Sequence, residues 1–269
     1  MMDLIFGSIG CGNMGYALSL AAAKALPKEN LLFTDLDNEK ARTAAKETGG
    51  RAVTSDEIAE TADMILLAVK PQVMDATVRS ILPAIKKRER KPILVTPAAG
   101  LSIARVSSMA EDTCRVIRMM PNTPVAVGSG MILYSADGDT SDADVADFCR
   151  VFAAAGRLDA IDEAKIDAAS AISGCGPAFA AIFCEALADA GVLAGLPRDK
   201  AILYAAEMMK GTASLILSGE HPAVLKDKVC SPGGTTIAGV RAMEENGFRN
   251  AAIEAVTAAY ERTLALGKK

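Results

Sequence analysis

The sequence predicts an α/β protein in which a mostly parallel, doubly wound sheet is followed by an all-α domain. Short apolar runs alternate with helix-like segments through about residue 160, which is the rhythm of βαβ units. A glycine-rich motif at residues 10–15 directly follows the first apolar run. From Glu163 onward, apolar residues recur only at helical spacing. We therefore expect a Rossmann dinucleotide-binding domain at 1–160 and a helical dimerisation and substrate domain at 161–269.

Six strands and three helices are expected in the first domain. The run at 64–69 is apolar without alternation, as in a strand covered on both faces. The predicted strands are residues 4–9, 31–34, 64–69, 93–96, 116–119 and 131–134. The predicted helices are residues 14–25, 38–47 and 72–85.

The second domain is expected to consist of helices rich in alanine, which is the best helix former and lets helices approach closely. These helices are apolar on more than one side, which favours a homo-oligomer over a self-contained monomeric bundle. The predicted helices are residues 163–173, 177–194, 198–217 and 248–266.

Composition narrows the function classes. The chain has 269 residues and a net charge of −4 without a basic stripe, which argues against nucleic acid as a partner. No uncharged apolar run of about 20 residues is present, so no membrane-spanning helix is expected. The six cysteines lack CxxC spacing and His221 is the only histidine, so no metal site is expected. Free thiols indicate a reducing compartment, and we expect a cytoplasmic protein.

Residues 10–15 read GCGNMG, the GxGxxG pattern, between an expected strand and an expected helix. Gly10 permits the tight turn, Gly12 lets the backbone approach a pyrophosphate, and Gly15 allows the helix to pack closely on the strand. Unpaired N–H groups at the helix N-terminus then bind the phosphates. The alternative is a glycine-rich turn without a ligand.

Asp35 ends the second expected strand, 20 residues after Gly15. An acidic group there binds the adenosine ribose hydroxyls of NAD and repels the 2′-phosphate of NADP. No basic residue follows before Lys40, so NADH is favoured over NADPH. The alternative is that Asp35 or Asp37 only caps the next helix.

Three further loops follow expected strands: AVKPQ at 68–72, TPAAG at 96–100 and MPNTP at 120–124. Each could be only a rigid turn, but together with the glycine-rich loop they outline a cleft. The small residues at 96–100 leave room for a nicotinamide.

Residues 230–237, CSPGGTTI, are expected to form a loop that enters a helix. Backbone N–H groups at such a terminus bind anions, and the Thr235 and Thr236 hydroxyls add hydrogen-bonding groups. A small carboxylate would fit, and an ordinary helix cap is the alternative. His221, at an expected helix start, is expected to be a capping or surface residue rather than a catalyst.

The ordered motifs resemble those of the pyrroline-5-carboxylate reductases over nearly all 269 residues. They are GCGNMG at 10–15, AVKPQ at 68–72, TPAAG at 96–100, MPNTP at 120–124, SGCGPAF at 173–179 and SPGGTTI at 231–237. The resemblance implies reduction of 1-pyrroline-5-carboxylate to L-proline with NAD(P)H. It also implies an interlocked dimer with sites at the dimer interface, and dimers that often assemble into larger rings.

The resemblance also implies residue roles. Gly234, Thr235 and Thr236 would bind the substrate carboxylate and ring, with the Thr236 hydroxyl facing the imine nitrogen as the catalytic group. The cofactor would be lined, together with Asp35, by Ile9, Gly10, Gly12, Asn13, Met14, Ala68, Lys70, Pro71 and Ala98.

Two positions depart from the family pattern. Cys175 and Phe179 stand where the family commonly has Ser and Tyr. Asp35 and Leu36 stand where many members have a polar or basic pair for the 2′-phosphate, which supports NADH.

Two other readings remain open at the level of sequence. A 3-hydroxyacid dehydrogenase would need a catalytic lysine such as Lys165 or Lys210, and a prephenate-type enzyme would need a histidine base. A dinucleotide sensor without turnover would be expected to carry a degraded second motif, whereas SPGGTTI is intact.

Overall fold

The computed structural model describes residues 4–267, so the outermost residues of both predicted domains, 1–3 and 268–269, lie outside the described part. The chain divides into two compact units. The first reaches Gly174 and includes the end of the chain from Tyr260 onward, and the second is Cys175–Ala259. The domain boundary at residue 160 stays a prediction; strand β8 ends at Ala160 and helix α7 (Glu163–Ser173) belongs to the first unit.

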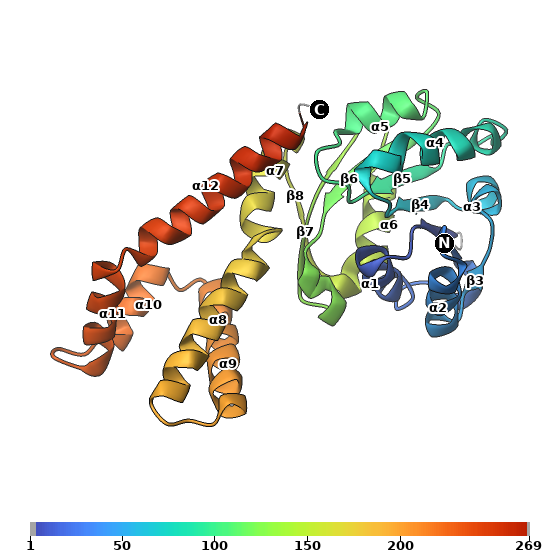
Figure 1. Ribbon diagram of the computed structural model, residues 1–269. Helices are drawn as coiled ribbons and strands as arrows, with labels where there is room; N and C mark the ends of the chain where they lie inside the picture. Colours follow the sequence, from blue (N-terminus) through green and yellow to red (C-terminus); the bar gives the residue numbers. More distant parts are fainter. Residues whose placement is uncertain (1–3, 268–269) are drawn as a thin grey trace. The chain divides into compact units, whose positions relative to one another are not determined.

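The first unit is built on one eight-stranded sheet in the order β3-β2-β1-β4-β5-β6-β7-β8 (Figure 1). The first six strands are parallel and have the 3-2-1-4-5-6 order of the doubly wound fold, while β7 runs antiparallel to β6 and β8 is parallel to β7. The predicted mostly parallel sheet is therefore confirmed. The strands are β1 Phe6–Ile9, β2 Leu31–Thr34, β3 Arg51–Ala52, β4 Met64–Leu67, β5 Ile93–Thr96, β6 Arg115–Met120, β7 Gly130–Ala136 and β8 Gly156–Ala160.

Helices cover both faces of this sheet because its central strands are apolar on both sides. In β4, Met64 and Leu66 pack in one core with α1, α2 and α6, whereas Ile65 and Leu67 pack in another with α3, α4 and α5. All four side chains are fully buried, as expected for the unbroken apolar run. These helices are α1 Asn13–Ala22, α2 Asn38–Thr48, α3 Ser55–Thr61, α4 Pro71–Ile85, α5 Ile103–Met109 and α6 Asp142–Phe152.

The sequence reasoning missed β3, β8, α3, α5 and α6. Strand β3 has two residues, and β8 (GRLDA) is mostly exposed at the sheet edge, so neither carries an apolar run. Helices α3 and α5 have only seven residues each. Short 3₁₀ segments at Lys28–Asn30, Thr123–Val127 and Ala153–Ala155 complete this unit.

Helix α7 is held on the sheet by a buried ion network within the first unit. Arg118 of β6, whose side chain is 5% exposed, donates to Asp167 and Glu163 of α7. Glu163 also accepts from the backbone N–H of Ile103 at 2.7 Å. Because a buried arginine is stable only when it is paired, this network fixes where α7 begins.

The second unit is helical, as predicted. Its most extensive packing joins α8 and α9 as an antiparallel pair through Gly195, whose φ of 97° favours glycine at the helix end. The rings of Phe183 and Phe248 also pack, with centroids 5.3 Å apart. Its helices are α8 Gly176–Leu193, α9 Arg198–Leu217, α10 Pro222–Val229, α11 Thr235–Glu245 and the first part of α12 Phe248–Gly267.

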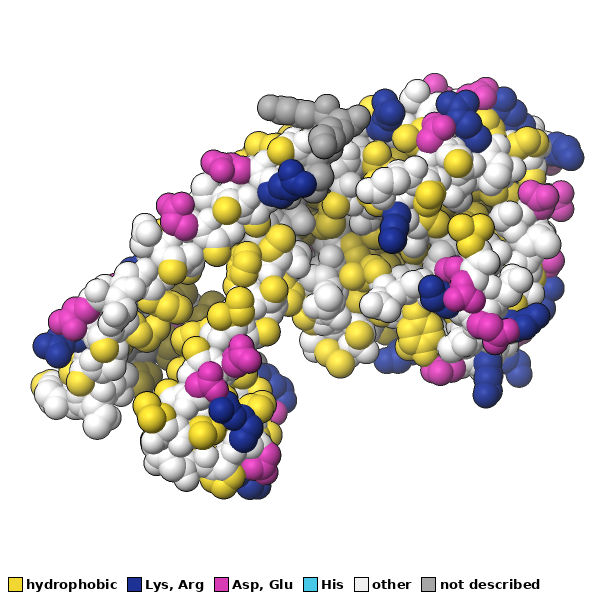
Figure 2. Space-filling model, viewed as in Figure 1, with side chains coloured by type: hydrophobic (Ala, Val, Ile, Leu, Met, Phe, Trp, Pro, Cys, Tyr) yellow, Lys and Arg dark blue, Asp and Glu magenta, His cyan; other side chains and the backbone are white. Residues whose placement is uncertain are grey.

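This unit has almost no core of its own. Among its described residues, the buried apolar side chains are only Ala188, Ala201 and Ala205. Large apolar side chains are exposed instead, with Leu193 at 91%, and Figure 2 shows yellow side chains along these helices. The stretch Glu163–Leu193, which begins in α7 of the first unit, is apolar and long enough to cross a membrane by length and composition alone, as core helices of soluble proteins also are. The unit thus exposes apolar surface of the kind that marks a protein–protein interface.

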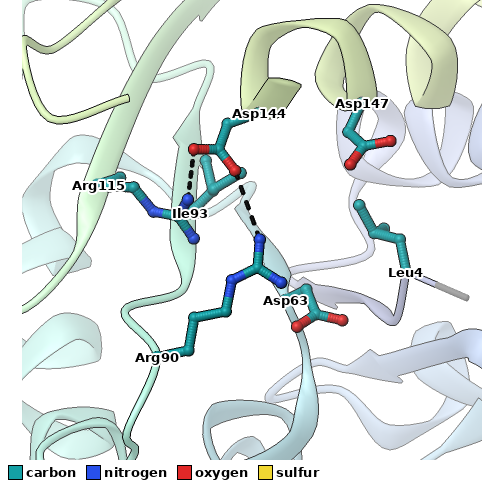
Figure 3. Close-up of a pocket in the computed structure, with 7 residues that line it drawn as sticks. All are labelled: Leu4, Asp63, Arg90, Ile93, Arg115, Asp144 and Asp147. Atoms are coloured by element: carbon teal, nitrogen blue, oxygen red, sulfur yellow. Dashed lines mark hydrogen bonds and ion pairs between the residues drawn. The ribbon is translucent and has the colours of Figure 1, made fainter. Parts of the chain in front are cut away.

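A small polar cavity of 290 Å³ lies at the amino ends of β5 and β6, lined by Leu4, Asp63, Arg90, Ile93, Arg115, Asp144 and Asp147 (Figure 3). Asp144, 6% exposed, accepts from Arg115 and lies 3.7 Å from Nη2 of Arg90. Ser141 donates its hydroxyl to Asp144 at 2.7 Å. Burial alone would raise the pKa of the Asp144 carboxyl, but the hydrogen bonds from Ser141 and Arg115 outweigh burial and hold this pKa below its ordinary value. The cluster is a structural ion network, on the opposite edge of the sheet from the strand ends where ligands bind.

At neutral pH, Asp144→Asn should lower the free energy of unfolding by about 3 kcal/mol, because Arg115 loses its buried carboxylate partner. Since the native pKa of Asp144 lies below that of the unfolded chain, this contribution is present above about pH 4 and is lost as the pH falls through the native pKa. Urea unfolding at several pH values between 7 and 3, at one protein concentration, measures the free energy of unfolding of both proteins. The difference between wild type and Asp144→Asn should become smaller as the pH falls. Asp147→Asn is the control; its partner Arg150 is 40% exposed, so the change should cost less than about 1 kcal/mol. A difference that stays constant with pH would contradict this account.

Candidate functional site

A cavity of 630 Å³ opens in the first unit at the carboxyl ends of β1, β2 and β4. The strand order reverses between β1 and β4, and in open α/β sheets this switch point is where ligands bind. The cavity is lined by Ile9, Gly10, Gly12, Thr34, Asp35, Leu36, Ser55, Ala68, Val69, Lys70, Val73, Ala76, Thr77 and Ser80.

The glycine-rich turn forms the inner wall of the cavity. Gly10 has a φ of 101°, and a Cβ there would lie 2.5 Å from the carbonyl oxygen of Ala68. A Cβ on Gly15 would lie 2.3 Å from the carbonyl oxygen of Gly10. Gly12 is different, because a Cβ there would meet nothing within 4 Å. Two glycines are therefore required by packing, whereas Gly12 leaves open space for a ligand.

Helix α1 begins at this open space with its N-terminus free. Its N-cap is Gly12, no side chain caps it among the described residues, and its first turn carries no acidic residue. The N–H groups and the helix dipole therefore favour an anion in the cavity. These features fit a dinucleotide pyrophosphate.

Asp35 lies where the ribose of the adenosine half is expected. Its Oδ2 accepts from the Cys11 N–H at 2.7 Å and its Oδ1 accepts from the Asp37 N–H at 2.9 Å. Burial, and secondly the Asp35 carboxylate, raise the pKa of the Cys11 thiol to about 12, so the thiol stays protonated. Asp37, not Asp35, caps α2 by accepting from the Glu39 N–H. Leu36 is fully exposed on the outer rim of the cavity.

The cavity brings together six of the ten predicted cofactor residues: Ile9, Gly10, Gly12, Asp35, Ala68 and Lys70. Four do not line it. Asn13 and Met14 are the first residues of α1, Pro71 is the first residue of α4, and Ala98 is buried in the core that includes α3, α4 and α5.

Sequence reasoning missed the outer wall of the cavity. One stripe of α4 lines it, formed by Val73, Ala76, Thr77 and Ser80 at helical spacing. The i, i+3, i+4, i+7 spacing of these four residues in the sequence could have indicated that they share one face of the helix. The spacing does not stand out as an apolar stripe, because three of the four side chains are small or polar.

The other two predicted cleft loops do not line this cavity and are held by other hydrogen bonds. Thr96 Oγ1 accepts from the Ala98 N–H at 3.2 Å. Asn122, 9% exposed, accepts from the Met131 N–H and donates to the Ser173 carbonyl, both at 2.9 Å. Asn122 therefore ties the 120–124 loop to β7 and to the end of α7.

The second predicted site lies on the other unit and forms the expected loop entering a helix. A turn closed by Gly234 N–H donating to the Ser231 carbonyl at 3.0 Å leads into α11, with Gly234 as its N-cap and no side-chain cap among the described residues. Gly233 has a φ of 66°. Thr235 is exposed and Thr236 half-buried, and neither hydroxyl has a hydrogen-bond partner in the described part of the chain. Two free hydroxyls thus stand at an uncapped helix N-terminus.

The groups that other dehydrogenases would need are engaged elsewhere or lie on the surface of the chain. His221 Nδ1 accepts from the Ala223 N–H at 3.3 Å and caps α10, as expected. Lys210 pairs with Glu207 and Lys165 is exposed on α7. Across residues 4–267, no group of three or more His, Cys, Asp or Glu side chains is placed to hold a metal ion.

Gly12→Val should raise the Kd for NADH and NADPH by about tenfold or more while lowering the melting temperature only slightly, because the side chain would fill the ligand space and cost no more than a poorer N-cap. Fluorescence titration and thermal unfolding measure the two effects. Gly15→Val is the matched control and should lower stability, since its Cβ meets the Gly10 backbone. Normal cofactor binding by Gly12→Val would show that this cavity is not the dinucleotide site.

Comparison with known proteins matches both units. The family model for pyrroline-5-carboxylate reductase dimerisation matches residues 163–266, and the model for NADP oxidoreductase, coenzyme F420-dependent, matches residues 5–100. The pyrroline-5-carboxylate reductase of Escherichia coli is 38% identical, covering 99% of this chain and 100% of that protein. The enzyme of Synechocystis is 41% identical, covering 100% of both chains.

Solved structures agree. Pyrroline carboxylate reductase of Plasmodium falciparum with NADP bound is 32% identical, with a TM-score of 0.88 and coverage of 99% of both chains. The pyrroline-5-carboxylate reductase of Coxiella burnetii is 26% identical, with a TM-score of 0.89 and coverage of 98% of both chains. The chain therefore belongs to the pyrroline-5-carboxylate reductase family.

Proposed function

We propose that this protein reduces 1-pyrroline-5-carboxylate to L-proline with NAD(P)H, the last step of proline biosynthesis. The observation that carries the proposal is full-length similarity to reductases of that name in bacteria and plants. The cavity beside the glycine-rich turn and the uncapped turn of α11 supply the two binding sites that this reaction needs.

The residues of the cavity fit the nicotinamide dinucleotide. Gly12 and the first N–H groups of α1 would hold the pyrophosphate, Asp35 would face the adenosine ribose, and Leu36 with the α4 stripe would cover the adenine. Ala68 and Lys70 would line the path between β4 and α4, and Pro71 would support it from the first position of α4. When bound, the reduced nicotinamide supplies a hydride to the imine carbon.

NADH as the preferred cofactor is part of the proposal. The Asp35 carboxylate would repel a 2′-phosphate, and the neighbouring exposed Leu36 offers no positive charge. Of the described residues that line the cavity, Lys70 alone is basic. It stands at the N-cap of α4, after β4, whereas Asp35 follows β2 on the other side of β1.

The substrate carboxylate would bind at the N-terminus of α11, where Gly234 is the N-cap and where Thr235 and Thr236 present N–H groups and hydroxyls without other partners among the described residues. Thr236 would orient the imine nitrogen and stabilise the amine by hydrogen bonding. A hydroxyl is too weak an acid to protonate the imine, so its role is positioning of an already protonated, electrophilic imine. This accounts for a reduction without a catalytic histidine or lysine.

We propose a homodimer or larger homo-oligomer in the cytoplasm. The dimerisation model covers residues 163–266, where the exposed apolar side chains of α8 and α9 gather. A partner copy would also account for the apolar character of Glu163–Leu193. The six cysteines are free thiols, as is usual in a reducing compartment.

The direct test is loss of absorbance at 340 nm with pyrroline-5-carboxylate, run in parallel with NADH and NADPH. Rapid oxidation is expected with both, and kcat/KM should be higher with NADH because Asp35 disfavours the 2′-phosphate. Faster turnover with NADPH would overturn the cofactor preference alone. Cofactor binding without oxidation would overturn the reductase and favour another imine or keto substrate, or a sensor.

Thr236→Ala should lower kcat/KM by roughly ten- to a thousandfold, the scale of losing one oriented hydroxyl in the transition state. Steady-state kinetics with saturating cofactor measures it. Thr236→Ser keeps the hydroxyl and should recover most of the rate, and cofactor Kd should stay unchanged in both variants. An unaltered rate in Thr236→Ala would remove this side chain from the mechanism.

A further inference from the structure

The Asp35 carboxylate is bound to the glycine-rich turn. Cys11, whose N–H donates to Asp35 Oδ2 at 2.7 Å, lies between Gly10 and Gly12, the two glycines of the cavity wall. The other carboxylate oxygen accepts from the Asp37 N–H at 2.9 Å. Each oxygen therefore already has one backbone donor before any ligand is present.

Only two other hydrogen bonds of the described chain tie this turn to β2. The Gly10 N–H donates to the Thr34 carbonyl at 2.8 Å, and the Cys11 thiol lies 3.6 Å from the same oxygen. The second of these is weak, because sulfur is a poor donor. The bond to Asp35 is charge-assisted and so about twice as strong as a neutral one. The hydrogen bond from the Cys11 N–H to Asp35 is therefore the strongest side-chain interaction that holds the Cys11 peptide next to the end of β2.

That attachment lies next to the phosphate-binding groups. Gly12 follows Cys11 directly and caps α1, and its extended ψ of −178° turns the chain into the helix. If the Cys11 peptide rotates, the N–H groups at the start of α1 lose their alignment toward the cavity. The steric limits at Gly10 and Gly15 restrict the turn but supply no hydrogen bond to Cys11.

We propose that Asp35 is a positioning residue for the pyrophosphate-binding turn, in addition to facing the adenosine ribose. This inference rests on the proposed dinucleotide site, not on the identity of the reduced substrate. Loss of the carboxylate would then weaken the binding of every nicotinamide nucleotide, including one that has no adenosine half. Substitutions meant to admit NADPH at this position would weaken NADH binding through the turn as well.

The probe that separates the two roles is reduced nicotinamide mononucleotide, which carries nicotinamide, ribose and one phosphate but no adenosine. Asp35→Ala should raise its Kd about ten- to a hundredfold, the scale of one charged hydrogen bond, and should raise the Kd of NADH at least as much. Asp35→Asn keeps one acceptor oxygen for the Cys11 N–H and should restore part of the affinity for the mononucleotide. Leu36→Ala is the matched control: it should weaken NADH binding and leave the mononucleotide unaffected.

Hydrogen exchange of the ligand-free protein is the second measurement. The amides of residues 10–14 should exchange faster in Asp35→Ala than in the wild type, with other strands of the sheet unchanged. Unaltered mononucleotide affinity and unaltered exchange in Asp35→Ala would overturn the proposal and leave Asp35 with a ribose role only. A wild-type protein that binds NADH but does not reduce pyrroline-5-carboxylate would overturn the proposed function and leave this inference standing.

Discussion

The backbone contact between the first βα turn and the end of β4 is the constraint on which the cofactor site depends. Gly10 approaches the Ala68 carbonyl, and Gly15 approaches the Gly10 carbonyl, more closely than any side chain would allow. This contact brings the start of α1 to the switch point between β1 and β4. The cavity at this switch point and the free N–H groups at its inner wall follow from it.

The two units differ in how they become stable. The first buries apolar strands between two layers of helices, and its buried charges are paired, as with Arg118 and Arg115. The second buries only alanines and leaves leucines and isoleucines exposed. Since exposed apolar area of this kind is stable only when it is covered, the second unit needs a partner surface, in keeping with the dimerisation model that matches it.

The proposed reaction depends on the positioning of the substrate and the cofactor more than on acid–base groups of the protein. The thiol of Cys11 is kept protonated by burial, and His221 is occupied as a helix cap. The two sites offer instead uncapped helix N-termini, at α1 and α11, as ready-made partners for a pyrophosphate and a carboxylate. The helix N-termini would bind the two anionic molecules and orient them. Orientation is sufficient for hydride transfer because a protonated imine is already electrophilic.

The sequence by itself determined the sheet class, the place of the dinucleotide turn and the helices of the second unit, because each depends on local patterns. Helices α7 and α9 have the predicted bounds, and β5 matches residue for residue. Only the tertiary structure decided the features that depend on contacts between segments far apart in the sequence. The polar edge strand β8, the reversal at β7 and the α4 stripe of the cavity depend on neighbours distant in sequence. So does Asp35, whose bond to Cys11 spans 24 residues, because a carboxylate finds such a partner only when β1 and β2 lie side by side.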